Sequence, residues 1–201
     1  MGFTRIATPP GALNDPRGMR EFPPAFYGAI RHIDRFSEAT GKLISLSMLF
    51  LVVSISYECF SRYLLNAPTT WVFDTSYMAN GMAFMLGCGY ALLKGAHVRT
   101  DMLWDGFSAR RKGTIDLASY LFLFYPTMLV LFWISVDDAW ISFDLRETSE
   151  QTPWRPLMWP FRAAVPLAAL LLMIQGISEV LKSWFQVRTG REFEHREKVE
   201  V

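Results

Sequence analysis

Side chains that could carry chemistry are sparse in the apolar parts of this 201-residue sequence. The three histidines, His32, His97 and His195, all lie in polar segments, so no histidine pair is placed to hold a haem inside an apolar helix. Ionisable and coordinating groups in the middle of a membrane-spanning helix are costly and usually functional. The apolar segments contain two amides, Asn80 and Gln175, and the sequence has no metal-ligand spacing, catalytic triad or phosphate-binding loop. We therefore expect a protein that is not an enzyme and holds no cofactor or metal.

One charge pair and one proline stand out against this background. Glu58 and Arg62 are four residues apart, where they can form an ion pair on one face of a helix. The pair either adds little energy at a helix end or docks a neighbouring helix or an external protein. Pro126 lies deep inside an apolar segment, where a simple kink is the favoured interpretation.

The overall composition argues against several protein classes. The 20 basic and 19 acidic residues balance, so no net field attracts nucleic acid. The two cysteines, Cys59 and Cys88, lie in or beside apolar segments and indicate small buried side chains, not a disulfide framework. Hydrophobic residues make up 51% of the chain, and the charges collect between apolar blocks.

Four blocks without any charged residue set the expected fold. They contain fifteen residues after Lys42, nineteen after Asp74, twenty after Asp116 and sixteen after Arg162. Twenty helical residues span about 30 Å, the thickness of a bilayer core, so the second and third blocks qualify outright and the other two qualify once their flanks are included. We expect an all-α integral membrane protein with four transmembrane helices near 42–65, 74–94, 114–143 and 161–185.

The segments outside these helices carry fewer signals. Apolar residues at helical spacing across 25–41 predict an amphipathic helix that lies either on the membrane surface or on a partner protein. Residues 1–24 and 188–201 are rich in proline or charge and are expected to be tails, which leaves 25–187 as the membrane domain. Fourteen Lys and Arg flank the spans on one side and four on the other, which predicts that both termini are cytoplasmic.

Small residues recur along the second expected span. The stripe is Ala79, Ala83, Gly87 and Ala91, with Gly81 and Gly89 close to it. In lipid, small residues four apart allow helix backbones to approach closely, so we expect a neighbour to pack there. Whether that neighbour is another helix of this chain or a second protein is open.

The segment from Glu150 to Pro166, which runs into the fourth expected span, combines prolines with aromatic residues. Pro153, Pro156, Pro160 and Pro166 stiffen it, and Trp154 and Trp159 add contact area. Such a segment suits either a platform at the membrane interface or a docking surface. If it docks a protein, the candidate contact residues are Trp154, Arg155, Trp159 and Arg162.

Two motifs resemble those of a known family. "RYLLNAPTTW", followed by the glycine-rich span and then by "GAHVRTDML", is similar to the small membrane subunit of tripartite ATP-independent periplasmic (TRAP) transporters, the DctQ-like family. The likeness covers about residues 26–187. Its specific part is Arg62, Tyr63, Asn66, Trp71, Gly95, His97, Arg99 and Asp101. Where the family usually has an acidic pair after the tryptophan, this chain has only Asp74.

The resemblance implies a role and a set of partners. A four-helix subunit of this family stands in the bacterial inner membrane beside a much larger permease subunit, which holds the substrate and sodium sites and moves like an elevator. The small subunit is a fixed scaffold among the lipids, and a periplasmic binding protein delivers the substrate, commonly an organic acid. The alternative hypothesis is a membrane anchor or assembly subunit of an unrelated complex, and the substrate itself is not predicted.

Overall fold

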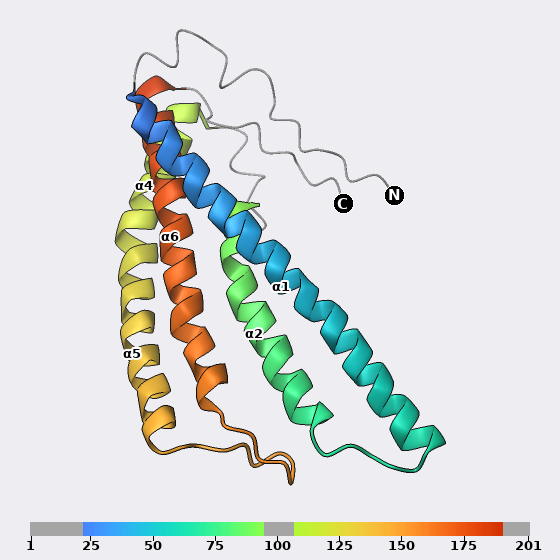
Figure 1. Ribbon diagram of the computed structural model, residues 1–201. Helices are drawn as coiled ribbons and strands as arrows, with labels where there is room; N and C mark the ends of the chain where they lie inside the picture. Colours follow the sequence, from blue (N-terminus) through green and yellow to red (C-terminus); the bar gives the residue numbers. More distant parts are fainter. Residues whose placement is uncertain (1–21, 95–106, 191–201) are drawn as a thin grey trace, which may run out of the picture.

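The structure is a computed structural model that describes residues 22–94 and 107–190, and the statements below concern these residues. Helices make up most of them (Figure 1). Their order is α1 (Pro24–Leu64), α2 (Val72–Leu93), α4 (Ala109–Ser119), the π-helical η1 (Tyr120–Phe124), α5 (Tyr125–Asp144) and α6 (Trp159–Thr189). The expected all-α architecture is confirmed. Of the predicted tails 1–24 and 188–201, residues 1–21 and 191–201 lie outside the described residues, while Pro24 already belongs to α1 and α6 runs on to Thr189.

The helix α1 is one unbroken rod of 41 residues, about 60 Å long at 1.5 Å per residue. Pro24 occupies its first turn, where a missing N–H costs nothing, and no other proline follows within it. The patterns across 25–41 and 42–65 predicted two helices, but the structure joins them without a break. Gly41, at the junction, is helical, and the Tyr90 ring lies against it where a Cβ would be.

Three helical stretches are long and apolar enough to cross a membrane: Ala25–Leu64, Ala109–Asp144 and Trp159–Thr189. The second expected span, now α2, is not among them although its 22 residues reach about 33 Å. Its first half carries Asp74, Thr75, Ser76 and Asn80, which lower its mean hydropathy. Three of the four expected spans thus meet the length and composition test, and α2 as a fourth stays a prediction.

Pro126 is accommodated by a change of helix type. A proline at this position cannot donate to the carbonyl four residues earlier, and its ring would collide with that carbonyl. Immediately before it, Tyr120–Phe124 form a π-helical turn, in which the Tyr125 N–H bonds to the Tyr120 carbonyl five residues back. The expected kink therefore takes the form of a π-bulge within a continuous rod that already begins at Ala109.

The last helix, α6, begins earlier than expected and includes two prolines of the proline-rich segment. Pro160 lies in its first turn, and Pro166 is buried inside the helix. At the other end, Gly190 adopts φ 68° and donates its N–H to the Gln186 carbonyl, the left-handed cap that glycine favours.

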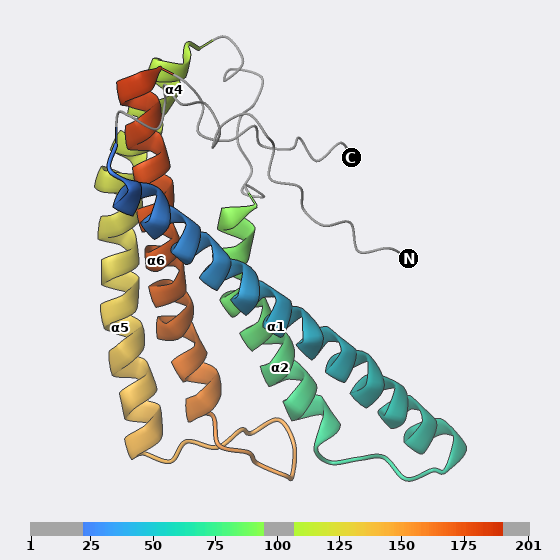
Figure 2. The same cartoon turned by 45° about the horizontal axis from the view of Figure 1, so that its top comes forward.

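Helix α2 lies between α1 and α6, and α5 runs alongside α6 (Figures 1 and 2). The first turns of α1 cross α6, and the rest of α1 diverges from it along α2. Small residues line these contacts. A Cβ built on Gly41 would lie 2.4 Å from Tyr90 Cγ, one on Gly81 2.6 Å from Phe161 Cε2, and one on Gly176 2.7 Å from Phe124 Cε1. Close approach through glycine is the packing mode of helices in lipid.

The outward surface of the helices is strongly apolar. Phe122 on η1, Trp133 on α5 and Leu43 on α1 are exposed by 77%, 72% and 72%. A soluble protein rarely exposes contiguous apolar surface of this extent, whereas hydrocarbon solvates it without cost. Together with the three candidate spans, this surface indicates a multi-pass membrane protein.

Candidate functional site

A network of polar side chains ties α1 to α6 where the two helices cross. The Asp34 carboxylate accepts hydrogen bonds from Ser178 Oγ (2.7 Å) and Gln175 Nε2 (3.1 Å), and its second oxygen lies 2.9 Å from Lys182 Nζ. Ser37 Oγ donates to Gln175 Oε1 at 2.7 Å. Gln175 and Ser178 are fully buried, so each would be costly without its partner. The network is therefore a polar lock between the two helices.

The sequence pointed to Gln175 as one of two amides in the apolar segments, but it did not predict the network between α1 and α6. The overlooked signal is the spacing 175, 178, 179 and 182 on α6, which places four polar residues on one face of an otherwise apolar helix. Lys182 also pairs with the buried Glu179 at 3.2 Å. On α1, Asp34 and Ser37 lie one turn apart on the face that meets these residues. A helix on the membrane surface would show the same polar spacing, so the spacing alone did not indicate a contact with α6.

Asp74 anchors the loop between α5 and α6. Its carboxylate is 1% exposed and accepts hydrogen bonds from Ser149 Oγ (2.6 Å) and from Thr152 Oγ1. Asp74 lies in the first turn of α2, where the helix dipole favours a negative charge. The loop is closed on itself by Ser149 N–H donating to the Pro156 carbonyl at 2.8 Å and Met158 N–H to the Glu147 carbonyl at 2.9 Å. This carboxylate therefore fastens the loop between α5 and α6 onto α2.

A second carboxylate organises the turn between α1 and α2. Glu58 accepts from Arg62 Nε at 2.9 Å and from the Thr69 backbone N–H at 3.0 Å, and the Thr69 hydroxyl donates to it as well. The predicted Glu58 and Arg62 pair thus exists, and it closes its own connecting turn. Nearby, Asn66 adopts φ 51°, a left-handed conformation that asparagine tolerates better than most residues.

The four candidate docking residues of the outer segment have different environments. The Arg162 guanidinium is engaged within the chain, 2.5 Å from Asp138 Oδ1 and 2.6 Å from Glu147 Oε1, so it joins α6 to α5 and to the loop. Trp159 packs its ring edge against Phe143 with centroids 5.6 Å apart. Trp154 is 50% exposed, and Arg155 is exposed with φ 47°. Of the four, Trp154 and Arg155 present the most available surface.

The small-residue stripe on α2 does not stay on one face. A spacing of four residues advances about 40° around a helix at each step, so Gly87 and Ala91 have turned well away from Ala79. Ala83 is 5% exposed, and a Cβ on Gly89 would lie 3.6 Å from Leu171 Cβ. A Cβ on Gly87 would meet nothing within 4 Å. Gly81 and Gly89 thus serve packing within the chain, and Gly87 faces outward.

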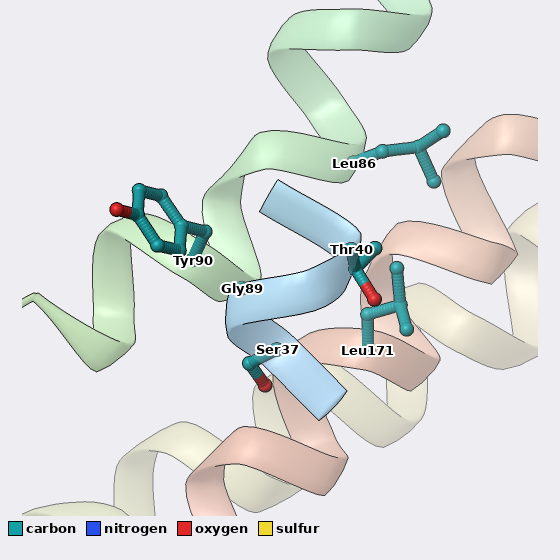
Figure 3. A pocket seen from close by; sticks show the side chains of 6 residues that line it. All are labelled: Ser37, Thr40, Leu86, Gly89, Tyr90 and Leu171. Atoms are coloured by element: carbon teal, nitrogen blue, oxygen red, sulfur yellow. The ribbon is translucent and has the colours of Figure 1, made fainter. Parts of the chain in front are cut away.

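A crevice where α1, α2 and α6 meet offers no binding site. Figure 3 shows it, lined by Ser37, Thr40, Leu86, Gly89, Tyr90 and Leu171. It has no room for a water molecule. Within the described ranges no three His, Cys, Asp or Glu side chains are grouped to hold a metal ion. The polar clusters around Asp34, Asp74 and Glu58 thus join elements of the chain, and this crevice is closed to a solute.

Comparison with known proteins places the chain in a family. The family model described as "Tripartite ATP-independent periplasmic transporters, DctQ component" matches residues 51–186, more than half of the 201. The chain belongs to the DctQ family. No curated protein and no solved structure matches it. The resemblance predicted from the two motifs is therefore confirmed.

The first DctQ-like motif is fully described by the structure, and it surrounds the turn between α1 and α2. Arg62 bonds Glu58, Asn66 supplies the left-handed turn residue, and Trp71 stacks on Tyr57 with ring centroids 6.3 Å apart. Tyr63 is 77% exposed. The second motif, with Gly95, His97, Arg99 and Asp101, lies outside the described residues.

Proposed function

We propose that this DctQ protein is the non-catalytic scaffold subunit of a sodium-coupled secondary transporter for organic acids. In this role it braces a larger, elevator-type permease subunit and helps to dock a periplasmic substrate-binding protein. It is a four-span protein of the bacterial inner membrane with both termini in the cytoplasm. The observation that carries the proposal is that, in a chain of this transporter family, the buried Gln175, Ser178 and Asp74 bond other elements of the same chain, and the crevice where α1, α2 and α6 meet has no room for a solute.

A scaffold must keep its shape while a neighbour moves, and the internal ties suit that task. Asp34 and its partners bind α1 to α6, Asp74 binds the outer loop to α2, and Arg162 binds α6 to α5. Contacts at Gly41, Gly81 and Gly176 hold the apolar lengths of the helices together as well. Polar hydrogen bonds between helices fix their register, which apolar packing alone specifies weakly.

Docking of a soluble partner is assigned to the loop between α5 and α6. The loop is pinned by Asp74 at Ser149 and Thr152, so its tip is presented in one conformation. Trp154 and Arg155 are exposed at that tip, and tryptophan and arginine are the residues that most often dominate protein interfaces. A preorganised loop also loses little conformational entropy on binding.

Reconstitution tests the scaffold role directly. The purified chain is placed in liposomes with a sodium gradient, alone or together with the large permease subunit and the binding protein, and uptake of a panel of radiolabelled organic acids is measured. We expect uptake only from the complete set. Sodium-driven uptake by the chain alone would refute the scaffold role, and failure to co-purify with any large polytopic subunit after mild detergent extraction would refute the pairing.

A further inference from the structure

Most of one face of α2 points away from the rest of the chain, with Tyr77 at its edge packed on Phe161 of α6 at a ring-centroid distance of 5.3 Å. Phe73, Tyr77, Asn80, Phe84 and Gly87 fall within a sector of about 80° when residues are placed 100° apart around the helix. Phe73, Tyr77 and Phe84 are exposed by 61%, 53% and 78%, and Asn80 is exposed as well. The buried residues Val72, Asp74, Met78, Gly89 and Leu92 lie on the other sides of the helix. We call the five outward residues the Asn80 face.

The Asn80 amide lacks a hydrogen-bond partner on this face. Its side chain forms no hydrogen bond with any residue that the structure describes, whereas Gln175, the other amide of the apolar segments, is buried and doubly bonded. Asn80 lies eight residues into α2, about 12 Å from the helix start, which is within the hydrocarbon if α2 spans the membrane. Lipid chains cannot bond an amide, so an exposed amide at this depth is costly unless another protein satisfies it.

The Asn80 face also has room for a close approach. Gly87 lies two turns from Asn80, and a Cβ on it would meet nothing within 4 Å, so a foreign backbone could pack against it. The exposed surface of η1 and α5 is different. Phe122, Trp133 and Ile134 are bulky there, and the exposed Thr127 donates its hydroxyl to the Leu123 carbonyl of its own helix. That surface suits lipid.

We propose that the Asn80 face is the contact for a transmembrane helix of the large permease subunit, and that this helix supplies a hydrogen-bonding group to Asn80. The inference rests on the proposed function. A DctQ protein is one component of a three-part transporter, and a soluble periplasmic component cannot reach an amide about 12 Å along a spanning helix. The occupant is therefore the membrane component. Phe84 and Tyr77 flank the amide and would shield its bond from lipid and water.

Photocrosslinking in the assembled complex tests the location. A benzophenone side chain is introduced at Phe84 in the full chain, co-expressed with the large subunit, and compared with the same group at Phe122 and at Trp133, which are similarly exposed on the other surface. We expect an adduct with the large subunit from position 84 and none from the other two. Adducts from 122 or 133 but not from 84, or an adduct of two copies of this chain from 84, would overturn the proposal.

Substitution tests the chemistry of the contact. Asn80→Leu removes the interhelical hydrogen bond and should weaken association with the large subunit about five-fold. Gly87→Leu holds the backbones apart and should abolish co-purification, while Thr127→Leu, a matched change on α5, should leave association unchanged. Asn80→Gln should restore part of the affinity. Each variant is first shown by circular dichroism and gel filtration to fold alone.

These results separate the location from the function. If the Asn80→Leu and Gly87→Leu variants both associate with the large subunit as strongly as the wild type, the Asn80 face is not the contact, while the scaffold role stands. Absence of any association by the wild-type chain would instead defeat the proposed function, and the location with it.

Discussion

Lys182 Nζ on α6 lies 2.9 Å from Asp34 Oδ2 on α1, and this ion pair joins residues 148 positions apart in the sequence. Both side chains are mostly buried, with 12% and 20% exposed. The same carboxylate also accepts from Ser178 and Gln175, so one group satisfies three buried donors on the neighbouring helix. Asp34 is therefore the centre of the contact that holds the cytoplasmic part of α1 in the proposed topology.

Removing this carboxylate should weaken the fold more than any surface charge does. Asp34→Ala leaves Ser178 and the Gln175 amide without their acceptor and takes from Lys182 one of its two carboxylate partners, and we expect a loss of about 2–3 kcal/mol in the free energy of unfolding. Asp34→Asn keeps an acceptor oxygen but removes the charge, and should cost less. Denaturation of the detergent-solubilised chain followed by circular dichroism measures both. Glu38→Ala breaks an exposed pair with Lys42 and is the control; equal losses for Asp34→Ala and Glu38→Ala would contradict the lock.

Loss of Asp74 should release the outer loop while leaving the helices in place. Asp74→Ala removes the acceptor for Ser149 and Thr152, which should cost about 1–3 kcal/mol and expose the loop backbone. Hydrogen exchange of residues 145–158 should become faster, with α5 and α6 unchanged. Glu150→Ala, on an exposed residue of the same loop, should have no effect. Unaltered exchange in Asp74→Ala would show that the loop is held by other contacts.

Two glycines on α1 should respond in opposite directions to the same change. A Cβ at Gly41 would lie 2.4 Å from Tyr90 Cγ, so Gly41→Ala must displace a ring near its attachment and should cost about 1–3 kcal/mol. A Cβ at Gly28 would meet nothing within 4 Å, so Gly28→Ala should be neutral or stabilise the helix by up to about 1 kcal/mol. Melting temperatures in one detergent compare them. A Gly41→Ala protein as stable as the wild type would place Tyr90 elsewhere.

The exposed tip of the outer loop should matter for the soluble partner and not for the membrane pair. Trp154→Ala should weaken binding of the periplasmic protein to the assembled complex about ten-fold. Trp140→Ala, at a tryptophan of α5 that is 68% exposed, is the control. Biolayer interferometry with the complex in nanodiscs measures affinity, and gel filtration reports assembly. If both variants bind the soluble partner as the wild type does, Trp154 is an interfacial anchor only.

Local signals predicted the helices well and their boundaries less well. Apolar blocks located the helices because every backbone polar group in hydrocarbon must be bonded within its own segment. The continuity of α1 was missed because a polar face at 25–41 reads as a surface helix, whether that face meets water or, as here, meets α6 through Asp34 and Ser37. The π-helical turn before Pro126 has no signature beyond the proline itself.

The site residues divide by whether their partners are near or far in the sequence. The Glu58 and Arg62 pair was predictable because four residues bring side chains together on any helix. The partners of Asp74 lie 75 and 78 residues away, in a loop whose fold no local pattern specifies. The small-residue stripe was read as one face, but the drift of a four-residue repeat sends Gly87 outward, while Gly81 and Gly89 meet Phe161 and Leu171.

The sequence by itself determined that this is a helical membrane protein and which family it belongs to, because hydrophobic block length and two short motifs are local properties of the chain. Only the tertiary structure decided which polar groups are paired across helices and which face of α2 is left open. Those outcomes depend on how α1, α2 and α6 cross, and the crossing is set by the combined packing of residues such as Gly41, Tyr90 and Gln175, which lie far apart in the sequence.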